Sequence, residues 1–263
     1  DTMSADRASM NDHVLDVSTF LQGAKAVISA RTRYLPKFNR EIDEDYGVRL
    51  DCAKFTNVFR DLLDNLASKP FARTVDLAET SKRQWPEMAE FVENVDGAGN
   101  HLHVFAGDLF FNAIAYSIDW LVVDKTPVRP GASLREEREN GARVYWYRVP
   151  LRDVLAVYSD IVNGEEIFTH FRFRENIVIR EGFGERVVER VRVFDRPRVG
   201  GTRDRPIYGD AIWQLYERQD QAPGATSPVQ WKIVDQGAVG LGIIPIIPVA
   251  TGRREGRSWR FVR

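Results

Sequence analysis

The spacing of apolar residues changes along the chain. Up to about residue 118 they recur at helical intervals, and after residue 143 they alternate with polar residues with a period of two. In the first part, Pro70 closes a segment that predicts an amphipathic helix with one buried stripe, formed by Phe55, Phe59, Leu62 and Leu66. The pattern therefore predicts helices first and strands second.

Two more helices are expected on either side of the DGAGN turn at residues 96–100. Pro86 suits the first turn of the helix before it. After the turn, Asn100 is a candidate N-cap for a helix that should be the most buried of the chain, with its apolar face formed by Phe105, Ala106, Leu109, Phe110, Ala113 and Ile114. WLVVD at residues 120–124 then predicts a strand. A capping-box pattern predicts a short surface helix from Ser133 towards Gly141.

Several short strands are expected after residue 143. Alternation is clearest in RVVERVRVF at 186–194, where valines alternate with arginines, and the segments 166–176, 211–219 and 228–236 resemble it in β-branched and aromatic content. Turn sequences such as EGFGE separate them. The expected fold class is α+β, with N-terminal helices packed on a mainly antiparallel β-sheet region. The expected division is a mainly helical part at 1–125, a β-rich part at 126–252 and an Arg-rich segment at 253–263.

Composition narrows the class of protein. The 263 residues are 43% hydrophobic, which is enough to fill a core, and the 37 basic and 38 acidic residues leave a formal charge of −1. A general nucleic-acid-binding protein would carry a basic excess, so any contact with DNA must be local. The longest uncharged stretch, at 236–252, is too short and too rich in Gly and Pro for a membrane helix. We therefore expect a protein with no membrane partner.

The single cysteine, Cys52, excludes an internal disulfide and a cysteine-based metal site. It favours a reducing compartment, and we interpret it as a small buried apolar residue. The first residues lack the apolar core of a signal peptide. The acidic run EIDEDYG at 41–47 is interpreted as the start of a helix, where negative charge is favourable, and not as a cation site.

The turn DGAGNHLH raises the question of a phosphate or metal site. A dinucleotide fingerprint needs a preceding strand and three glycines, whereas here a helix precedes Gly97 and the third glycine is missing. A metal site could use His101, His103 and Asp96. On a helix, however, positions i and i+2 point about 200° apart, so the two imidazoles could share a metal only before the helix begins.

No other catalytic pattern is present. The sequence contains no G-x-S-x-G elbow and no H-E-x-x-H pair. We therefore expect no catalytic residues, no cofactor and no resident metal, and a structural role instead of an enzyme. The last candidate is RREGRSWRFVR, in which Arg253, Arg254 and Arg257 could contact nucleic acid beside Trp259 and Phe261. An equally weighted alternative is a segment whose charges are paired by residues outside this sequence.

Three segments together resemble a known family. The first carries a G-x-x-x-V…YLP element, a Y-x-x-R-x-x-x-A element and a closing Lys-Pro pair, formed by Gly23, Val27, Tyr34, Leu35, Pro36, Tyr46, Arg49, Ala53, Lys69 and Pro70. The second is the glycine turn with the helix and strand behind it, through Asp96, Gly97, Gly99, Leu102, Phe105, Ala106 and LVVD. The third is the run of strands from VERVRVFDRP to GIIPIIPV. In this combination the chain resembles a branch of the portal proteins of tailed bacteriophages, over about residues 20–251.

The resemblance implies a function without catalysis. Proteins of this family form a ring, usually a dodecamer, at one vertex of the capsid, through which double-stranded DNA is packaged and ejected. The implied partners are other copies of the chain, the major capsid protein, the large subunit of terminase, head–tail connector or adaptor proteins, and the DNA itself. The implied location is the virion, after assembly in the cytoplasm of the bacterial host. The sequence would correspond to the wing-side body, with residues 253–263 leading towards a stem.

Two other functions remain open. One is a metal-dependent hydrolase or nuclease that uses His101, His103 and Asp96, which a metal titration of histidine variants would distinguish. The other is a different virion component, such as another head–tail connector. That component should be a smaller chain with fewer strands than this sequence predicts.

Overall fold

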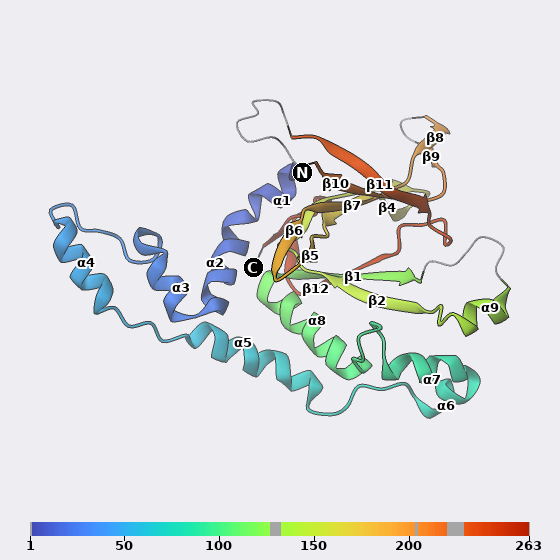
Figure 1. Ribbon diagram of the computed structural model, residues 1–263, viewed down its shortest axis with the longest axis horizontal. Coiled ribbons are helices and arrows are strands. Elements are labelled where there is room, and N and C mark those ends of the chain that lie inside the picture. The colour runs from blue at the N-terminus through green and yellow to red at the C-terminus, as the bar shows by residue number, and fades with distance from the viewer. Residues whose placement is uncertain (1, 127–132, 203–204, 220–228, 263) are drawn as a thin grey trace.

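The computed structural model describes residues 2–126, 133–202, 205–219 and 229–262, and it confirms the α+β fold with helices first. The chain begins with helices at residues 5–22 that pack on a β-rich body. Residues 24–51 then extend away from this body as a helical arm (Figure 1). The helices are α1 (Ala5–Ser9), α2 (Asn11–Gln22), α3 (Ala24–Ser29), α4 (Asp43–Asp51), α5 (Val58–Ser68), α6 (Glu79–Gln84), α7 (Pro86–Glu93), α8 (Leu102–Tyr116) and α9 (Leu134–Glu139), with 3₁₀ turns at Arg31–Arg33 and Lys69–Phe71.

Two antiparallel sheets form the body. The smaller sheet has the order β12-β1-β2, and the larger has the order β11-β10-β7-β4-β3. Their strands are β1 (Ile118–Lys125), β2 (Val144–Val149), β3 (Val154–Val162), β4 (Glu165–Arg174), β7 (Arg190–Asp195), β10 (Ile212–Arg218), β11 (Trp231–Ala238) and β12 (Ile246–Ala250). Three two-stranded hairpins complete the described strands: β5 (Ile177–Glu181) with β6 (Gly184–Val188), β8 (Arg198–Gly201) with β9 (Pro206–Tyr208), and β13 (Arg253–Arg254) with β14 (Phe261–Val262).

Strand β1 connects the helical part to the β-rich part. It is the middle strand of the smaller sheet, and its alternating side chains serve two cores because successive residues of a strand point to opposite faces. Trp120 and Val122 join the large core shared with the five-stranded sheet, where the Trp120 and Phe171 rings lie 5.2 Å apart. Leu121 faces the other way and packs with Phe105 of α8. The predicted strand at 120–124 is thus confirmed, with sequence-distant strands β12 and β2 on either side of it.

The predicted buried stripe before Pro70 is confirmed for its aromatic half, because Phe55 and Phe59 pack against Phe20, and it is wrong for its two leucines. The helix α5 begins only at Val58, after the side chain of Asn57 accepts a hydrogen bond from the backbone N–H of Arg60. Its buried residues are Leu63 and Ala67, whereas Leu62 and Leu66 are 57% and 43% exposed. The helix is amphipathic as expected, but the side that packs against α8 is one position away from the predicted stripe.

The predicted strand at 186–194 is also wrong, because the chain forms two strands there. Val187 and Val191 were expected to share a face, but Val187 is exposed on the β5–β6 hairpin while its neighbour Val188 is buried. Strand β7 starts afresh at Arg190 and lies between β4 and β10. The strands expected at 166–176, 211–219 and 228–236 correspond to β4, β10 and β11.

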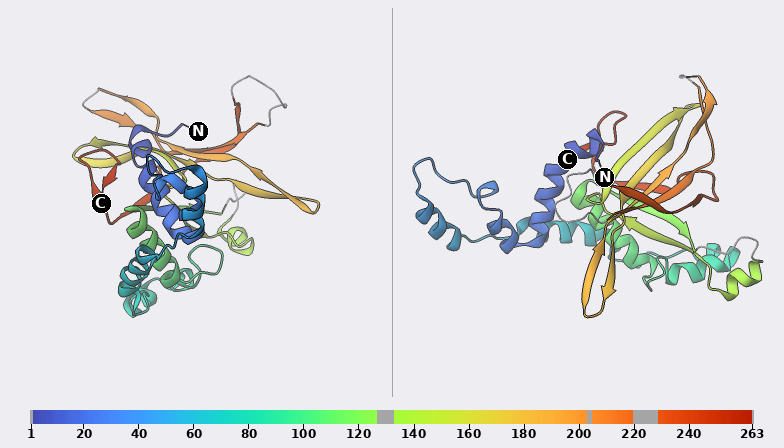
Figure 2. Two further views of the ribbon diagram at one scale, coloured as in Figure 1. Left: turned by 90° about the vertical axis from the view of Figure 1, so that its left-hand side faces the viewer. Right: turned by 45° about the horizontal axis from the view of Figure 1, so that its top comes forward.

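Two elements project from the body. The arm of α3 and α4 extends to one side, and the β5–β6 hairpin extends as a prong in a different direction (Figure 2). The predicted capping box of α9 is confirmed, since Glu136 accepts hydrogen bonds from the backbone N–H and the hydroxyl of Ser133. Cys52, which was interpreted as buried, is exposed at the end of α4.

Candidate functional site

The glycine turn is held together by its own polar side chains. Asp96 Oδ1 accepts hydrogen bonds from the backbone N–H of Ala98 at 2.8 Å and of Asn100 at 3.2 Å, and Asp96 Oδ2 accepts one from Asn100 Nδ2 at 2.6 Å. Burial by itself would raise the pKa of Asp96, but these hydrogen bonds outweigh it and lower the pKa. Asp96 therefore stabilises the turn. The side chain of Asn100 binds Asp96 and does not cap α8, as it was predicted to do.

His101 is the residue that caps α8. Its Nδ1 accepts a hydrogen bond from the backbone N–H of His103 at 3.0 Å. His103 Nδ1 in turn accepts one from the backbone N–H of Val75 at 3.1 Å. One nitrogen of each imidazole is thus used to hold backbone in place. Within the described ranges, no group of three or more His, Cys, Asp or Glu residues is placed to hold a metal ion.

The Arg-rich segment folds back onto the body. Arg254 donates two hydrogen bonds of 2.7 Å to the carboxylate of Glu166, and its guanidinium lies 3.9 Å from the centre of the Trp259 ring. The side chain of Arg254 is therefore largely occupied within the chain. Arg253 and Arg257 are exposed, so they are the members of the predicted contact set that are open to a partner.

The aromatic residues of this segment belong to the core. The Trp259 ring centre lies 5.2 Å from that of Trp120 and 5.0 Å from that of Phe168. Its indole N–H donates to the Ser159 hydroxyl at 2.8 Å, and Phe261 is buried. These rings are not available for stacking on bases. The nucleic-acid prediction for this segment therefore depends on charge alone.

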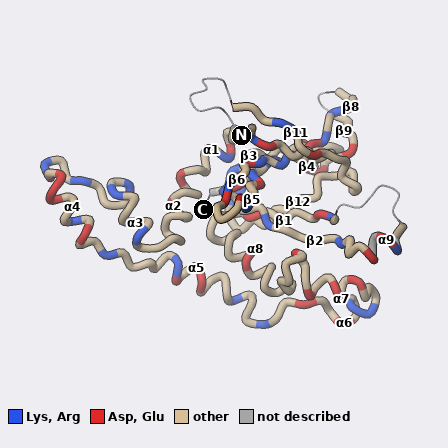
Figure 3. Tube along the Cα trace, viewed as in Figure 1, with Lys and Arg blue, Asp and Glu red and all other residues tan. Residues whose placement is uncertain are grey.

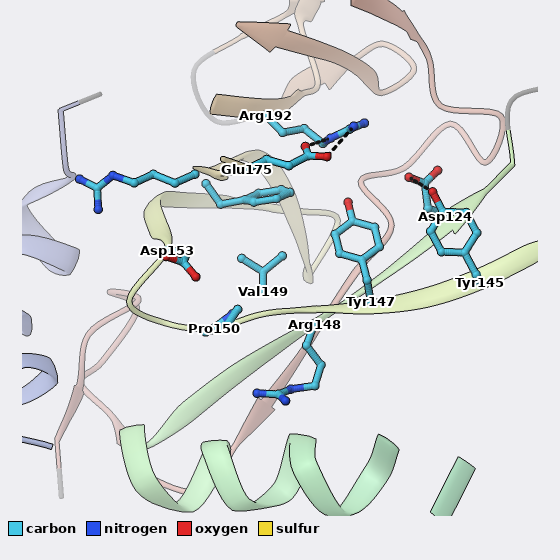
Figure 4. A pocket seen from close by; sticks show the side chains of 11 residues that line it. Asp124, Tyr145, Tyr147, Arg148, Val149, Pro150, Asp153, Glu175 and Arg192 are labelled. Atoms are coloured by element: carbon cyan, nitrogen blue, oxygen red, sulfur yellow. Dashed lines mark hydrogen bonds and ion pairs between the residues drawn. The ribbon is translucent and has the colours of Figure 1, made fainter. Parts of the chain in front are cut away.

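A pocket of about 290 Å³ opens between strand β2 of the smaller sheet and strands β4 and β7 of the larger one (Figure 4). No sequence pattern indicated it, because its residues come from separate strands that meet only in the fold. Its lining is formed by Asp124, Tyr145, Tyr147, Arg148, Val149, Pro150, Asp153, Phe173, Arg174, Glu175 and Arg192.

Several polar groups of the pocket bind one another. Arg192 Nη2 donates to Glu175 Oε1 at 3.0 Å, and the Tyr145 hydroxyl donates to Asp124 Oδ2 at 3.2 Å. Burial, together with Asp124, raises the pKa of Tyr145 to about 12. Burial also raises the pKa of Tyr147, whose hydroxyl has no hydrogen-bond partner among the described residues. The lining therefore presents tyrosine hydroxyls and charged groups, which could bind a polar group.

Helix α5 and the β5–β6 hairpin present apolar side chains to the solvent. Along α5, Val58, Leu62 and Leu66 are spaced four residues apart and are 64%, 57% and 43% exposed, so they form one continuous row. We call this row the α5 stripe. A second set lies on the β5–β6 hairpin, where Phe183 at the tip is completely exposed.

The whole molecule exposes more surface than a compact monomer does. Its accessible surface is 17325 Å². A compact folded monomer of 30.1 kDa is expected to expose about 11,700 Å². The chain therefore exposes about one and a half times the expected surface.

Two further findings complete the description of the chain. In the part of the chain that the structure describes, no helix combines the length and the apolar character needed to cross a bilayer. Comparison of the sequence with protein-family models and with curated proteins finds no match.

Proposed function

We propose that the chain is a structural subunit of a homo-oligomeric ring. The observation that carries this proposal is the excess of exposed surface, about 5,600 Å² above the value for a compact monomer of this mass. Obligate subunit interfaces bury about 2,000 to 5,000 Å². An excess of this size is what a subunit with a neighbour on each side would hide on assembly.

The α5 stripe supports the same proposal. Monomeric proteins rarely leave rows of large apolar residues such as the α5 stripe in water, whereas subunit interfaces use them. Head-to-tail contacts between different surfaces of identical chains produce closed rings when the rotation closes. An elongated subunit with separate projections suits such contacts better than a two-fold dimer that buries one patch (Figures 1 and 2).

The resemblance of the sequence to the portal proteins of tailed bacteriophages suggests which kind of ring the chain forms. We propose that it is the portal at a capsid vertex, which passes double-stranded DNA during packaging and ejection. Its proposed partners are the major capsid protein, the large subunit of terminase and head–tail connector or adaptor proteins. It would be assembled in the bacterial cytoplasm and carried in the virion.

The distribution of charge is compatible with this role. Acidic and basic residues are interspersed along the chain (Figure 3). A channel that gripped phosphates strongly would hinder sliding DNA, because each neutralised phosphate adds to the affinity.

The test is the mass of the intact protein in solution together with electron microscopy of the particles. We expect ring-shaped assemblies of about twelve copies. Assembly should persist in high salt, because apolar contacts are not screened as exposed ion pairs are. A protein that remains monomeric at high concentration would contradict the proposal.

A further inference from the structure

The β5–β6 hairpin stands apart from the two main sheets. It forms a separate two-stranded sheet, and its strands are joined by a two-residue turn in which Gly182 has a φ of 63°. The turn places Phe183 at the tip, where its side chain is completely exposed. Figure 2 shows the hairpin projecting from the body in a direction different from that of the arm.

One face of the hairpin is apolar near its middle. Val178 and Val187 lie directly opposite each other across the two strands, so their side chains share a face, and they are 62% and 59% exposed. The next pair on the same face towards the tip, Arg180 and Glu185, has opposite charges. A partner surface for this face should therefore be apolar with a polar rim.

A hairpin that projects into water in this way gains little stability from the rest of its chain. Two-stranded hairpins are only marginally stable alone, and stability requires further strands or packing against another element. Within its own chain the hairpin buries mainly Val188 at its base. The rest of its length lacks this support, and an exposed Phe adds further apolar area without benefit to the isolated chain.

The α5 stripe is a second unsupported apolar surface of the same chain. The opposite side of α5 packs against α8 through Leu63 and Ala67, which leaves Val58, Leu62 and Leu66 facing outwards. Asp61, Asp64 and Asn65 flank the row and give it a polar border. A row of this kind fits a partner that inserts an aromatic anchor beside it.

We propose that the hairpin of one subunit docks on the α5 stripe of the next subunit. In this contact Phe183, Val178 and Val187 of one copy cover Val58, Leu62 and Leu66 of its neighbour. The inference rests on the proposed ring, and it names the surfaces that join its subunits.

The occupant is a second copy of the chain for two reasons. A ring needs two different and complementary surfaces on every subunit, and the hairpin and the stripe are two such surfaces on separate elements. The exposed area also exceeds that of a compact monomer by about 5,600 Å², which is enough for contacts of obligate size on both sides of the subunit.

The first test replaces Phe183 with Ser in the intact protein. Because this side chain is completely exposed, its loss should leave the circular dichroism spectrum and the urea midpoint of the dissociated chain unchanged. The concentration at which half of the chains are assembled should rise by at least about tenfold, as expected for an aromatic anchor at the centre of an interface. The matched control is Val199→Ser, since Val199 is 65% exposed on a different two-stranded hairpin, and it should assemble like the wild type.

The second test identifies the surface that the tip contacts. In a Cys52→Ser background, a Phe183→Cys protein is mixed with a Leu62→Cys protein under assembly conditions and oxidised. We expect disulfide-linked heterodimers of the two variants. A Val199→Cys protein mixed with the Leu62→Cys protein should give none.

The outcomes separate this inference from the ring itself. Rings that form normally with Phe183→Ser, or a cross-link only between two Phe183→Cys chains, would overturn the docking of the hairpin on α5 while the ring stands. A change of mass that appears only after another protein is added would likewise replace the second copy with that partner. A wild-type protein that never assembles would overturn the ring, and the docking with it.

Discussion

At the scale of single residues, Asp119 shows how burial changes the acidity of a side chain. This carboxylate lies on β1 with no exposed surface, and Arg148 Nε donates to its Oδ2 at 2.9 Å. Its other oxygen has no hydrogen-bond partner among the described residues. Burial raises the pKa of Asp119 to about 6 although the nearby Arg148 opposes the shift. Near neutral pH the fold therefore contains an ionised carboxylate whose burial is only partly compensated.

Replacing Asp119 with Asn should change how stability depends on pH. Between the ordinary pKa of 3.8 and about 6, the unfolded chain has released the proton while the folded chain retains it. The free energy of unfolding of the wild type therefore contains a contribution that falls as the pH rises through this window. Relative to wild type, Asp119→Asn should gain up to about 3 kcal/mol of stability between pH values of about 4 and 7. Urea unfolding of both proteins across this range is the measurement, and parallel profiles would contradict the assignment.

The exposed arginines give a second prediction at this scale. If the predicted nucleic-acid contact is made by charge, replacing Arg253 and Arg257 with Gln should weaken binding of double-stranded DNA equally for all sequences. The slope of the logarithm of affinity against the logarithm of salt concentration should fall by about two, because two phosphate contacts are lost. Fluorescence titrations at several salt concentrations measure this, with Arg152→Gln as a control on an exposed arginine outside the segment. An unchanged slope would remove the two arginines as contacts.

Individual residues were the least predictable level of the structure. Asn100 has a side chain suited to an N-cap, yet Asp96 binds it and His101 takes the cap. Cys52 has an apolar character suited to a core, yet it is exposed. In each case the outcome depends on neighbours brought close by the fold, which residue preferences along the chain do not include.

At the scale of elements, α5 shows why spacing alone could not identify the buried side. Leu62 and Leu66 are four residues apart, and so are Leu63 and Ala67, so both rows satisfy the helical period. The position of α8 decides between them, because α8 packs on the second row. The helical spacing of the apolar residues predicted that α5 is a helix, and its packing against α8 determined which face is buried.

The two rows should therefore respond differently to the same substitution. Leu63→Ala should lower the free energy of unfolding by about 3 kcal/mol, because it removes a buried side chain and leaves a cavity. Leu62→Ala, its exposed neighbour, should change the free energy of unfolding by no more than about 0.5 kcal/mol. Urea denaturation below the concentration of assembly compares them. Equal losses would show that α5 lies differently on the body.

The split between β6 and β7 has a related cause. The alternation of valines and arginines at 186–194 predicts strand structure correctly, but alternation does not reveal where a strand leaves one sheet and enters another. The consecutive exposed Val187 and buried Val188 mark this change of face, followed by a new start at Arg190.

At the scale of the whole molecule, the order of helices and strands could be predicted, but the shape could not. Periodicity and turn residues report local structure, and the α+β class follows from their order along the chain. The extended arm and the projecting hairpin depend on where elements find no partner in their own chain. The sequence patterns do not contain that information. A row of apolar residues has the same spacing in the sequence whether its own chain or a neighbouring subunit covers it.

Assembly should leave a pattern of protection across the molecule. When the ring forms, hydrogen exchange should slow by about tenfold or more in α5 and in the β5–β6 hairpin, because both would be covered and held. Exchange in β3 and β4 should not change, since they pair along their length within one subunit. Exchange measured by mass spectrometry above and below the assembly concentration tests this, and uniform protection of all elements would contradict it.

The exposed position of Cys52 also has a practical consequence. It is the single thiol of the sequence and lies at the end of α4, on the arm. A fluorophore attached there would mark every subunit at the same place without any engineered substitution. In a closed ring the labels would transfer excitation to one another, so fluorescence anisotropy would fall as the fraction of labelled chains rises. The steepness of that fall would count the copies in the assembly.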